Sequence, residues 1–280
     1  MNTAICETLF EDMGLTMPKN KIVIKLGGGL ITDKSQYKLV REERIQSVCK
    51  IISKMIKNDD SIILVHGAGS FGHLEAKKWH LSRGHIKEII DEQRLAVKNV
   101  RNDMIELNNY VVKYLKEFGI EGISHPPSKW ANGLGPQFNG DITMLGDEKK
   151  DTIQVTFGDV VDVHNEREFG ILSGDDLMVR ICKDIPGITH CIFLLGDTEG
   201  LLTKPPNEEG SELIPLWSNE QEITGRHESS QDVTGGIFLK AESASKIAQN
   251  VTNVWMIDGR IPERIAELVQ TGNTIGTKVI

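Results

Sequence analysis

Several features that mark secreted, membrane-spanning or nucleic-acid-binding proteins are scarce in this 280-residue chain. Its four cysteines show no C-x-x-C spacing, which disfavours both a disulfide framework and a zinc site. No apolar run approaches the roughly 18 residues that a transmembrane helix needs. The formal net charge of -8 leaves no basic excess for sequence-independent binding of nucleic acid. Residues 1–20 contain acids and lack the pattern of a secretion signal. We therefore expect a cytoplasmic protein that binds neither nucleic acid nor membranes.

The apolar segments alternate between the periodicity of strands and that of helices. Strands are predicted at residues 21–26, 61–65, 120–123, 152–157, 160–163, 190–195, 254–257 and 276–280, and helices at 45–56, 86–118, 177–185, 241–249 and 262–269. Gly158-Asp159 is predicted to be the turn of a hairpin. Strands that alternate with helices indicate a largely parallel sheet covered on both faces. The length suits one α/β domain or two small ones, and we favour a single domain at 21–280, preceded by an N-terminal extension at 1–20.

The segment 21–35, KIVIKLGGGLITDKS, places three glycines directly after a predicted strand. Such glycines let backbone N–H groups approach anionic oxygens closely, and Lys25 and Lys34 add positive charge. The segment has neither the G-K-[ST] ending of a P-loop nor the G-x-G-x-x-G of a Rossmann fingerprint. A plain tight turn is the alternative, because glycines often mark turns. In the context of the whole chain, the segment predicts a phosphate-binding turn.

A second glycine-rich turn, HGAGSFGH at residues 66–73, also follows a predicted strand. The C-terminal ends of parallel strands meet at one edge of a sheet, so the two turns could converge where open α/β sheets bind ligands. His73 could give a hydrogen bond or a charge to a phosphate. Its alternative role is to cap a helix, but its place in a turn with three glycines favours the phosphate. His66, at the end of an apolar strand, is interpreted as structural.

Three further turns place acids or a lysine after apolar stretches. In ILSGDDL, Ser173 or Asp175 could cap the following helix, and Asp176 could face the site. In GDTEGLL, Asp197 could contact a nucleotide ribose or hold the loop. In QDVTGGIFLK, a glycine pair offers backbone donors for a phosphate beside Lys240, at a predicted helix start.

Together these segments resemble the amino acid kinase superfamily, and within it the isopentenyl phosphate kinases, over about residues 21–280. The motifs that carry the resemblance occur in the family's order: KLGG with the later TDK, HGAGSFGH, GDVV, ILSGDD, the D-x-x-G of GDTEG, DVTGG with its lysine, and GTKV. The turn that ends in His73 is the most specific, because relatives that act on carboxylates or on uridine monophosphate generally lack that histidine. The resemblance implies a three-layer α/β/α sandwich around a largely parallel central sheet, a homodimer, and the use of ATP and Mg²⁺. The implied reaction transfers the γ-phosphoryl group of ATP to a small phosphate monoester, isopentenyl phosphate.

The resemblance also implies roles for individual residues. It assigns catalysis to Lys25, Lys34 and His73, nucleotide binding to Lys25, Gly27, Gly28, Gly29, Ala68, Asp197, Gly236 and Lys240, and acceptor binding to Gly67, Gly72, His73, Gly174 and Asp176. No residue is assigned to a metal. The chain departs from the family pattern at Gly29, where serine is usual, at Ala68, where glycine is common, and in GDTEG, where T-D-V-D-G is usual. These departures bear on phosphate affinity and on nucleotide preference.

An acceptor of this kind sets two requirements. A phosphate monoester is largely ionised near neutral pH, so the site needs no strong general base. A short prenyl tail needs an apolar pocket, which we expect from the helix that begins near Leu74 and from the segment 86–118.

Three alternatives to this activity can be compared on the same residues. A kinase of the same architecture could phosphorylate a phosphonate such as fosfomycin, because the anion-binding turns would serve either acceptor. A nucleotide-binding regulatory or storage protein could keep the fold and lose phosphoryl transfer, although the retained lysines and histidine argue against it. A Rossmann oxidoreductase would require the fingerprint that the first turn lacks.

Overall fold

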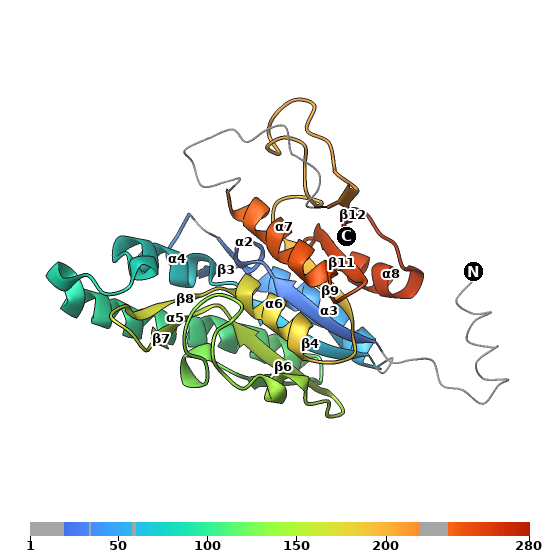
Figure 1. Ribbon diagram of the computed structural model, residues 1–280. Helices are drawn as coiled ribbons and strands as arrows, with labels where there is room; N and C mark the ends of the chain where they lie inside the picture. The colour runs from blue at the N-terminus through green and yellow to red at the C-terminus, as the bar shows by residue number, and fades with distance from the viewer. Residues whose placement is uncertain (1–19, 34, 58–59, 219–234) are drawn as a thin grey trace.

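The computed structural model describes residues 20–33, 35–57, 60–218 and 235–280 (Figure 1). In this part of the chain the central sheet has eight strands. Their spatial order is β10 (Leu216–Trp217), β12 (Gly276–Val279), β11 (Asn253–Asp258), β9 (Ile188–Leu195), β1 (Lys21–Leu26), β4 (Ser61–His66), β6 (Thr152–Phe157) and β5 (Glu121–Ser124). Strand β12 is antiparallel to β11, and every other neighbouring pair is parallel. The prediction of a largely parallel sheet is confirmed.

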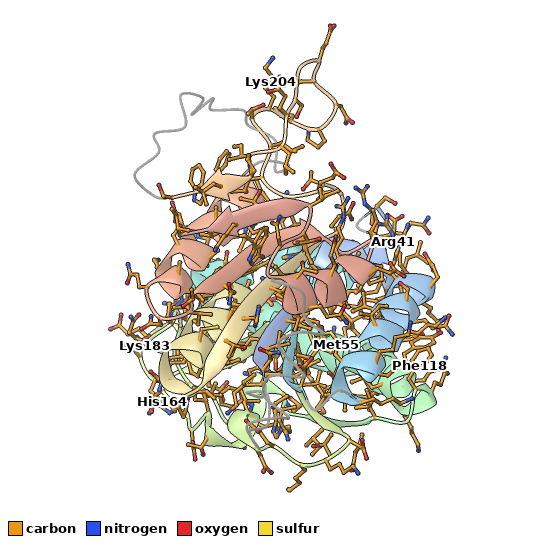
Figure 2. All side chains as sticks on the ribbon, turned by 90° about the vertical axis from the view of Figure 1, so that its right-hand side faces the viewer. Arg41, Met55, Phe118, His164, Lys183 and Lys204 are labelled. Atoms are coloured by element: carbon orange, nitrogen blue, oxygen red, sulfur yellow. The ribbon has the colours of Figure 1, made fainter. Side chains whose placement is uncertain are left out.

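Helices cover both faces of the sheet, which confirms the three-layer α/β/α sandwich. The α-helices are α2 (Gly28–Ile31), α3 (Glu42–Lys57), α4 (Gly69–Lys78), α5 (Ile90–Glu117), α6 (Gly174–Asp184), α7 (Gly235–Ala248) and α8 (Glu263–Thr271), and the 3-10 turns are η1 (Leu81–Arg83), η2 (Lys87–Ile89), η3 (Pro127–Lys129) and η4 (Thr143–Gly146). Buried side chains of α3, α5 and α8 share one apolar core with the sheet, and those of α6 and α7 share another. Figure 2 shows Met55 of α3 and Lys183 of α6 on opposite sides of the strands.

Strand β1 shows how the sequence sets these layers. Ile22, Ile24 and Leu26 belong to the core shared with α3 and α5, whereas Val23 belongs to the core shared with α6 and α7. Successive side chains of a strand point to opposite faces, so Lys25 emerges on the same face as Val23. The alternation therefore directs Lys25 toward α6 from inside a largely apolar strand.

The predicted hairpin across Gly158 is wrong. Strand β6 lies within the central sheet, and β7 (Asp159–Val163) instead pairs antiparallel with β8 (Glu168–Leu172). Gly158 does not reverse the chain, because its N–H donates to the carbonyl of His66 (3.1 Å) and so extends the parallel ladder of β4 and β6. The reversal is made by the polar residues 164–167.

Several boundaries also differ from the prediction, since the helices expected to begin at residues 45, 86 and 177 begin at Glu42, Ile90 and Gly174. Helix α7 begins at Gly235 rather than at Ala241. A short hairpin of β2 (Thr32–Asp33) and β3 (Leu39–Val40) follows α2. This hairpin was not predicted, because two-residue strands leave no periodicity in the sequence.

The described helices include none that is both long and apolar enough to cross a membrane. Of the predicted N-terminal extension at 1–20, only Asn20 belongs to the described residues, and its side-chain amide donates to the carboxylate of Asp60 (3.0 Å).

Candidate active site

The two glycine-rich turns meet at the C-terminal edge of the sheet. Strands β1 and β4 are parallel neighbours, and their last residues, Leu26 and His66, are paired in register. A Cβ atom on Gly28 would lie 2.4 Å from the backbone nitrogen of Gly69, and one on Gly67 would lie 2.8 Å from that of Gly28. Only glycine allows such close contact between backbones. The predicted convergence of the two turns is confirmed.

A third turn, which follows β9, packs against the first glycine-rich turn. Strand β9 is adjacent to β1 on the side opposite β4. A Cβ atom on Gly27 would lie 2.7 Å from the carbonyl oxygen of Leu194. One on Gly196 would lie 2.6 Å from the carbonyl carbon of Gly29. The turn that carries Asp197 therefore abuts the glycine triplet, and the three turns form one continuous surface of backbone.

Both glycine-rich turns lead directly into helices. Because α4 begins at Gly69, His73 lies within a helix and not in an open loop as the sequence suggested. The hydroxyl of Thr32 joins the two turns, since it donates to the carbonyl of Gly28 (2.8 Å) and accepts from the N–H of Ser70 (2.9 Å). Thr32 could not be predicted from the sequence, because a buried threonine at the end of an apolar segment gives no local signal.

A cavity of about 820 Å³ lies over these turns. Among its lining residues are the predicted site residues Lys25, Gly27, Gly28, Gly29, Gly67, Ala68, Gly72, His73, Gly174, Asp197, Gly236 and Lys240. The fold thus brings together residues predicted from five separate segments. Lys34 lies outside the described residues, as do residues 231–234 of the later glycine turn.

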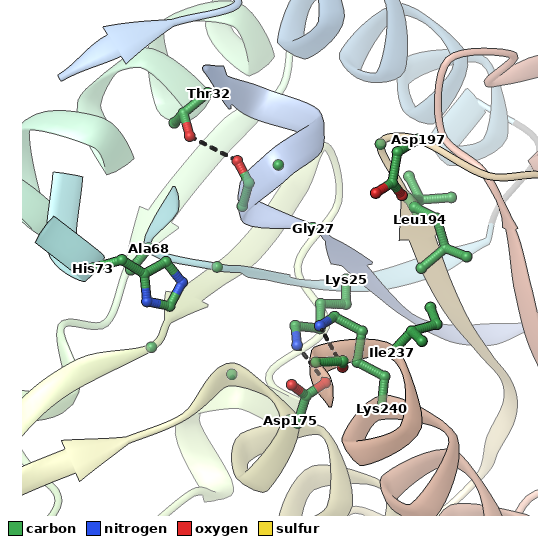
Figure 3. A pocket seen from close by; sticks show the side chains of 18 of the residues that line it. Lys25, Gly27, Thr32, Ala68, His73, Asp175, Leu194, Asp197, Ile237 and Lys240 are labelled. Carbon is green, nitrogen blue, oxygen red and sulfur yellow. Dashed lines mark hydrogen bonds and ion pairs between the residues drawn. The ribbon is translucent and has the colours of Figure 1, made fainter. Parts of the chain in front are cut away.

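Two lysines and an aspartate occupy the centre of the cavity (Figure 3). Lys25 is only 4% exposed, and its Nζ bonds to the carboxylate of Asp175 on α6. Lys240 on α7 lies beside this pair and donates to the carbonyl of Gly236 (2.9 Å). Burial lowers the pKa of Lys25, although the charge of Asp175 opposes this shift. Burial acts to raise the pKa of Asp175, but the charges of Lys25 and Lys240 outweigh it and lower that pKa, so the carboxylate is ionised.

The two ends of the cavity differ in position and in lining. Figure 3 shows His73 and Asp197 on opposite sides, with Lys25 between them. The end near Asp197 is bordered by the segment after β9, and Figure 2 shows Lys204, a lining residue of that segment, near the tip of its loop.

Apolar side chains form the wall near His73. Ala76 of α4 and Val100 and Met104 of α5 line the cavity. A Cβ atom on Gly72 would lie 3.5 Å from the sulfur of Met104, which places this wall next to the start of α4. The two helical segments expected to supply an apolar pocket both contribute to it. The wall suits an anion that carries a short hydrocarbon group.

Asp176 caps helix α6 and does not face the cavity, which corrects the prediction for this residue. Ser173 is the N-cap, and its hydroxyl accepts from the N–H of Asp176 (3.0 Å) while donating to the Asp176 carboxylate (2.7 Å). This reciprocal capping box leaves the neighbouring Asp175 to face Lys25. The S-x-x-D spacing of the capping box was the signal that could have told the two acids apart.

Arg41 is a further cavity residue that the sequence analysis missed. Its guanidinium donates to the carbonyl of Gly29 (3.1 Å) and to the carboxylate of Asp33 (3.1 Å). Hydrogen bonds from the hydroxyl and the backbone N–H of Ser35, and then one from Arg41, lower the pKa of Asp33 to about 2. Arg41 therefore ties the β2–β3 hairpin to the glycine triplet.

His66 is structural, as the sequence suggested. Its ring is fully buried, stacks on Phe157 with 4.9 Å between ring centres, and hydrogen-bonds with the side-chain oxygen of Asn108 (3.3 Å). Burial lowers the pKa of His66 to about 4, so the ring is neutral at physiological pH.

Known proteins share this sequence and this fold. The profile of the Amino acid kinase family matches residues 20–258. The isopentenyl phosphate kinase of Thermoplasma acidophilum is 32% identical over 250 residues, which cover 88% of this chain and 95% of that protein. The enzyme of the same name from Methanothermobacter thermautotrophicus is 25% identical over 267 residues, covering 92% and 98% of the two chains. The crystal structure of the T. acidophilum enzyme in its product complex has a TM-score of 0.76 and 30% identity, covering 93% of this chain and 100% of that one.

The profile match extends over most of the sheet, from β1 to β11, and over the turns that line the cavity. These similarities exclude the Rossmann oxidoreductase alternative, because a profile that covers most of the described fold describes a different family. The chain belongs to the amino acid kinase family.

Proposed function

We propose that this protein transfers the γ-phosphoryl group of ATP to isopentenyl phosphate, giving ADP and isopentenyl diphosphate. One observation carries the proposal: the buried Lys25 and the half-buried Lys240, at the centre of a single cavity, separate an end at Asp197 from an end where His73 stands beside an apolar wall. The first end suits a nucleotide, and the second suits a phosphate with a hydrocarbon tail. The similarity to several enzymes named isopentenyl phosphate kinase supports the same assignment.

The chemistry asks mainly for positioning and charge neutralisation, because the transferring phosphoryl group needs little covalent help from the protein. Lys25 and Lys240 would neutralise charge on the phosphate oxygens, and Asp175 would hold Lys25 in place. The backbone N–H groups of the first turn would add hydrogen-bond donors, because its glycines have no side chains that would block the close approach of a phosphate. We assign Lys34 to the same phosphoryl group on the family resemblance.

The acceptor half of the reaction falls to His73. Its imidazole would donate to the acceptor phosphate, and a protonated ring would add a charge to this bond. The attacking oxygen already belongs to an ionised phosphate monoester, so no residue is needed to remove a proton from it. The apolar wall formed by Val100 and Met104 would bury the tail.

Magnesium fits this site as an ion held chiefly by the substrate. In the described part of the chain, no group of three histidine, cysteine or carboxylate side chains is placed to bind a metal. Mg²⁺ is commonly bound by substrate phosphates with one or two carboxylates, and Asp175 and Asp197 line the cavity. Bound there with ATP, the ion would supply charge neutralisation, while the lysines orient the phosphates.

We further propose that residues 21–280 form one domain and that the protein is a cytoplasmic homodimer. The single continuous sheet supports the first statement, since it joins β1 to the C-terminal strand β12. The dimer rests on the family resemblance, and light scattering during size-exclusion chromatography tests it.

A coupled assay for ADP release tests the proposed reaction. We expect kcat/KM to be highest for isopentenyl phosphate or dimethylallyl phosphate, lower for butyl phosphate, and lowest for glycerol phosphate and fosfomycin. Each buried methylene should contribute about 0.8 kcal/mol, and a polar tail should be rejected because the wall cannot hydrogen-bond it. Equal or better turnover of glycerol phosphate would refute the prenyl acceptor, and a clear preference for fosfomycin would establish the phosphonate alternative.

A further inference from the structure

One buried carboxylate on α5 holds the segment that follows the first glycine turn. Asp103 is 7% exposed and accepts hydrogen bonds from the hydroxyl of Tyr37 (2.6 Å) and from the ammonium group of Lys38 (2.8 Å). Lys38 also bonds to Glu106, and its Nζ lies 5.6 Å from the centre of the Phe71 ring on α4. Tyr37 and Lys38, which lie between β2 and β3, thus contact the two helices that form the apolar wall, α4 and α5.

The other end of this segment is tied to the glycine triplet of the first turn. Asp33 and Ser35 line the cavity, and Arg41 links Asp33 to the carbonyl of Gly29. Contacts of Asp33 at one end, and of Tyr37 and Lys38 at the other, therefore hold the segment in place. Lys34 lies outside the described residues, and all of these contacts are made by its described neighbours.

Asp103 shares one turn of α5 with the apolar wall. Val100 and Met104, on either side of it in the sequence, line the cavity. Arg101, in the same turn, donates to the carbonyl of Val160 on β7 (2.8 Å). Helix α5 is therefore fixed on a second side, and it provides a firm support for the segment that Asp103 holds.

The backbone and the charges of this segment both depend on the contact. Lys38 has a left-handed φ of 56°, which is uncommon for a residue with a side chain and requires support from its surroundings. Burial acts to lower the pKa of Lys38, but its bonds to Asp103 and Glu106 outweigh this and raise it. The hydrogen bond to Asp103 raises the pKa of Tyr37 to about 12. Both donors therefore keep their protons at physiological pH.

We propose that Asp103 is a positioning residue for phosphoryl transfer, which fixes residues 35–38, between β2 and β3, beside the acceptor end of the cavity by holding Tyr37 and Lys38. This inference rests on the proposed function, because it concerns the acceptor half of that reaction. Asp103 does not line the cavity and acts only through the residues that it holds. The competing explanation is a purely structural ion pair, which would affect folding and leave the kinetic constants of the folded enzyme unchanged.

The test compares Asp103→Asn with the wild type in the ADP-release assay, using isopentenyl phosphate. A displacement of about 1 Å at a reacting group can cost about 10²-fold in rate, so we expect kcat to fall by about 10- to 10²-fold. The KM for ATP should stay within about twofold, because the nucleotide end is unaffected. Tyr37→Phe, which removes one exposed donor and should fold normally, is expected to show a smaller fall of the same kind.

Two further variants separate positioning from stability. Glu106→Gln removes the solvent-exposed partner of the same lysine and should retain wild-type kcat. Lys38→Met should reproduce the loss of Asp103→Asn, and the double variant should be no slower than either single variant, because both break one contact. Urea unfolding of each variant reports the stability effect independently.

The outcomes distinguish failure of this inference from failure of the proposed function. If the wild type does not phosphorylate isopentenyl phosphate, the proposed function is wrong, and the variants are compared on whichever acceptor gives ADP release. If the wild type is active and both Asp103→Asn and Tyr37→Phe keep its kcat, the positioning role is overturned. A raised KM for ATP with unchanged kcat would overturn it equally.

Discussion

The hydroxyl of Thr32 and the backbone N–H of Ser70 are hydrogen-bonded at 2.9 Å, which joins the end of the first turn to the start of α4. Thr32→Val removes this acceptor and the donor to Gly28, and leaves buried groups without partners. We expect a loss of about 1–3 kcal/mol in the free energy of unfolding and a lower kcat. Urea unfolding and steady-state kinetics measure both. Thr152→Val, at a more exposed site, is the matched control, and equal effects in the two variants would contradict a special role for Thr32.

Asp175→Asn should shift the alkaline limb of the pH profile of kcat to lower pH. Phosphoryl transfer requires Lys25 in its charged form. Burial lowers the pKa of Lys25, and the charge of Asp175 partly offsets that effect. Without that charge the pKa of Lys25 falls further, so activity is lost at a lower pH as the pH rises. Asp176→Asn removes the adjacent capping carboxylate and should cost about 1 kcal/mol in stability, while moving the limb much less, because the Asp176 charge acts on the pKa of Lys25 more weakly than that of Asp175. A shift of the limb in Asp176→Asn alone would reverse the assignment of the two acids.

His73→Ala should impair use of the phosphate acceptor and leave the KM for ATP nearly unchanged. A charge-assisted hydrogen bond contributes about 1.5–3 kcal/mol, so kcat/KM for the acceptor should fall by at least tenfold. His73→Gln should recover part of this loss, because an amide replaces one donor but not the charge. Initial rates with each substrate varied in turn provide the measurement. If the His73→Ala variant instead lost affinity for ATP and kept its KM for the acceptor, the assignment of His73 to the acceptor end of the cavity would be wrong.

Lys34→Ala should lower kcat far more than it raises either KM. A charge that meets the phosphoryl group mainly in the transition state contributes little to ground-state binding, and its removal costs on the order of 10²- to 10³-fold. Lys54→Ala, an exposed lysine on α3, is the control and should behave as wild type. A change in the KM for ATP with kcat intact would show that Lys34 only binds nucleotide.

The fold was largely predictable because its strands are long apolar runs that alternate with amphipathic helices. The exception at Gly158 is instructive, since a Gly-Asp pair between two apolar runs is typical of a turn. In this protein the glycine continues a parallel ladder, and nothing within its local sequence records the strand beside it.

Residues of the candidate site could be predicted only where the functional side chain lies in a recognisable local motif. Glycines, lysines and the histidine stand in recognisable turns, and the fold brings them to one cavity. Asp175 was misassigned because capping and catalysis call for the same residue type. The contact of Lys38 with Asp103 spans 65 positions and depends on how α5 crosses the sheet, so no local pattern could reveal it.

The backbone contacts among the three turns restrict how this enzyme can diversify. A new side chain on one of these glycines would collide with the main chain of a neighbouring turn or strand, and main chain cannot relieve a collision by changing rotamer. The acceptor wall is different, because Ala76, Val100 and Met104 contribute side chains that can be exchanged singly. Variation that retargets the enzyme to other tails should therefore accumulate on α4 and α5, while the phosphate-handling turns stay fixed. A combinatorial library confined to those three wall positions should yield active enzymes of altered selectivity at a much higher frequency than one directed at the turns.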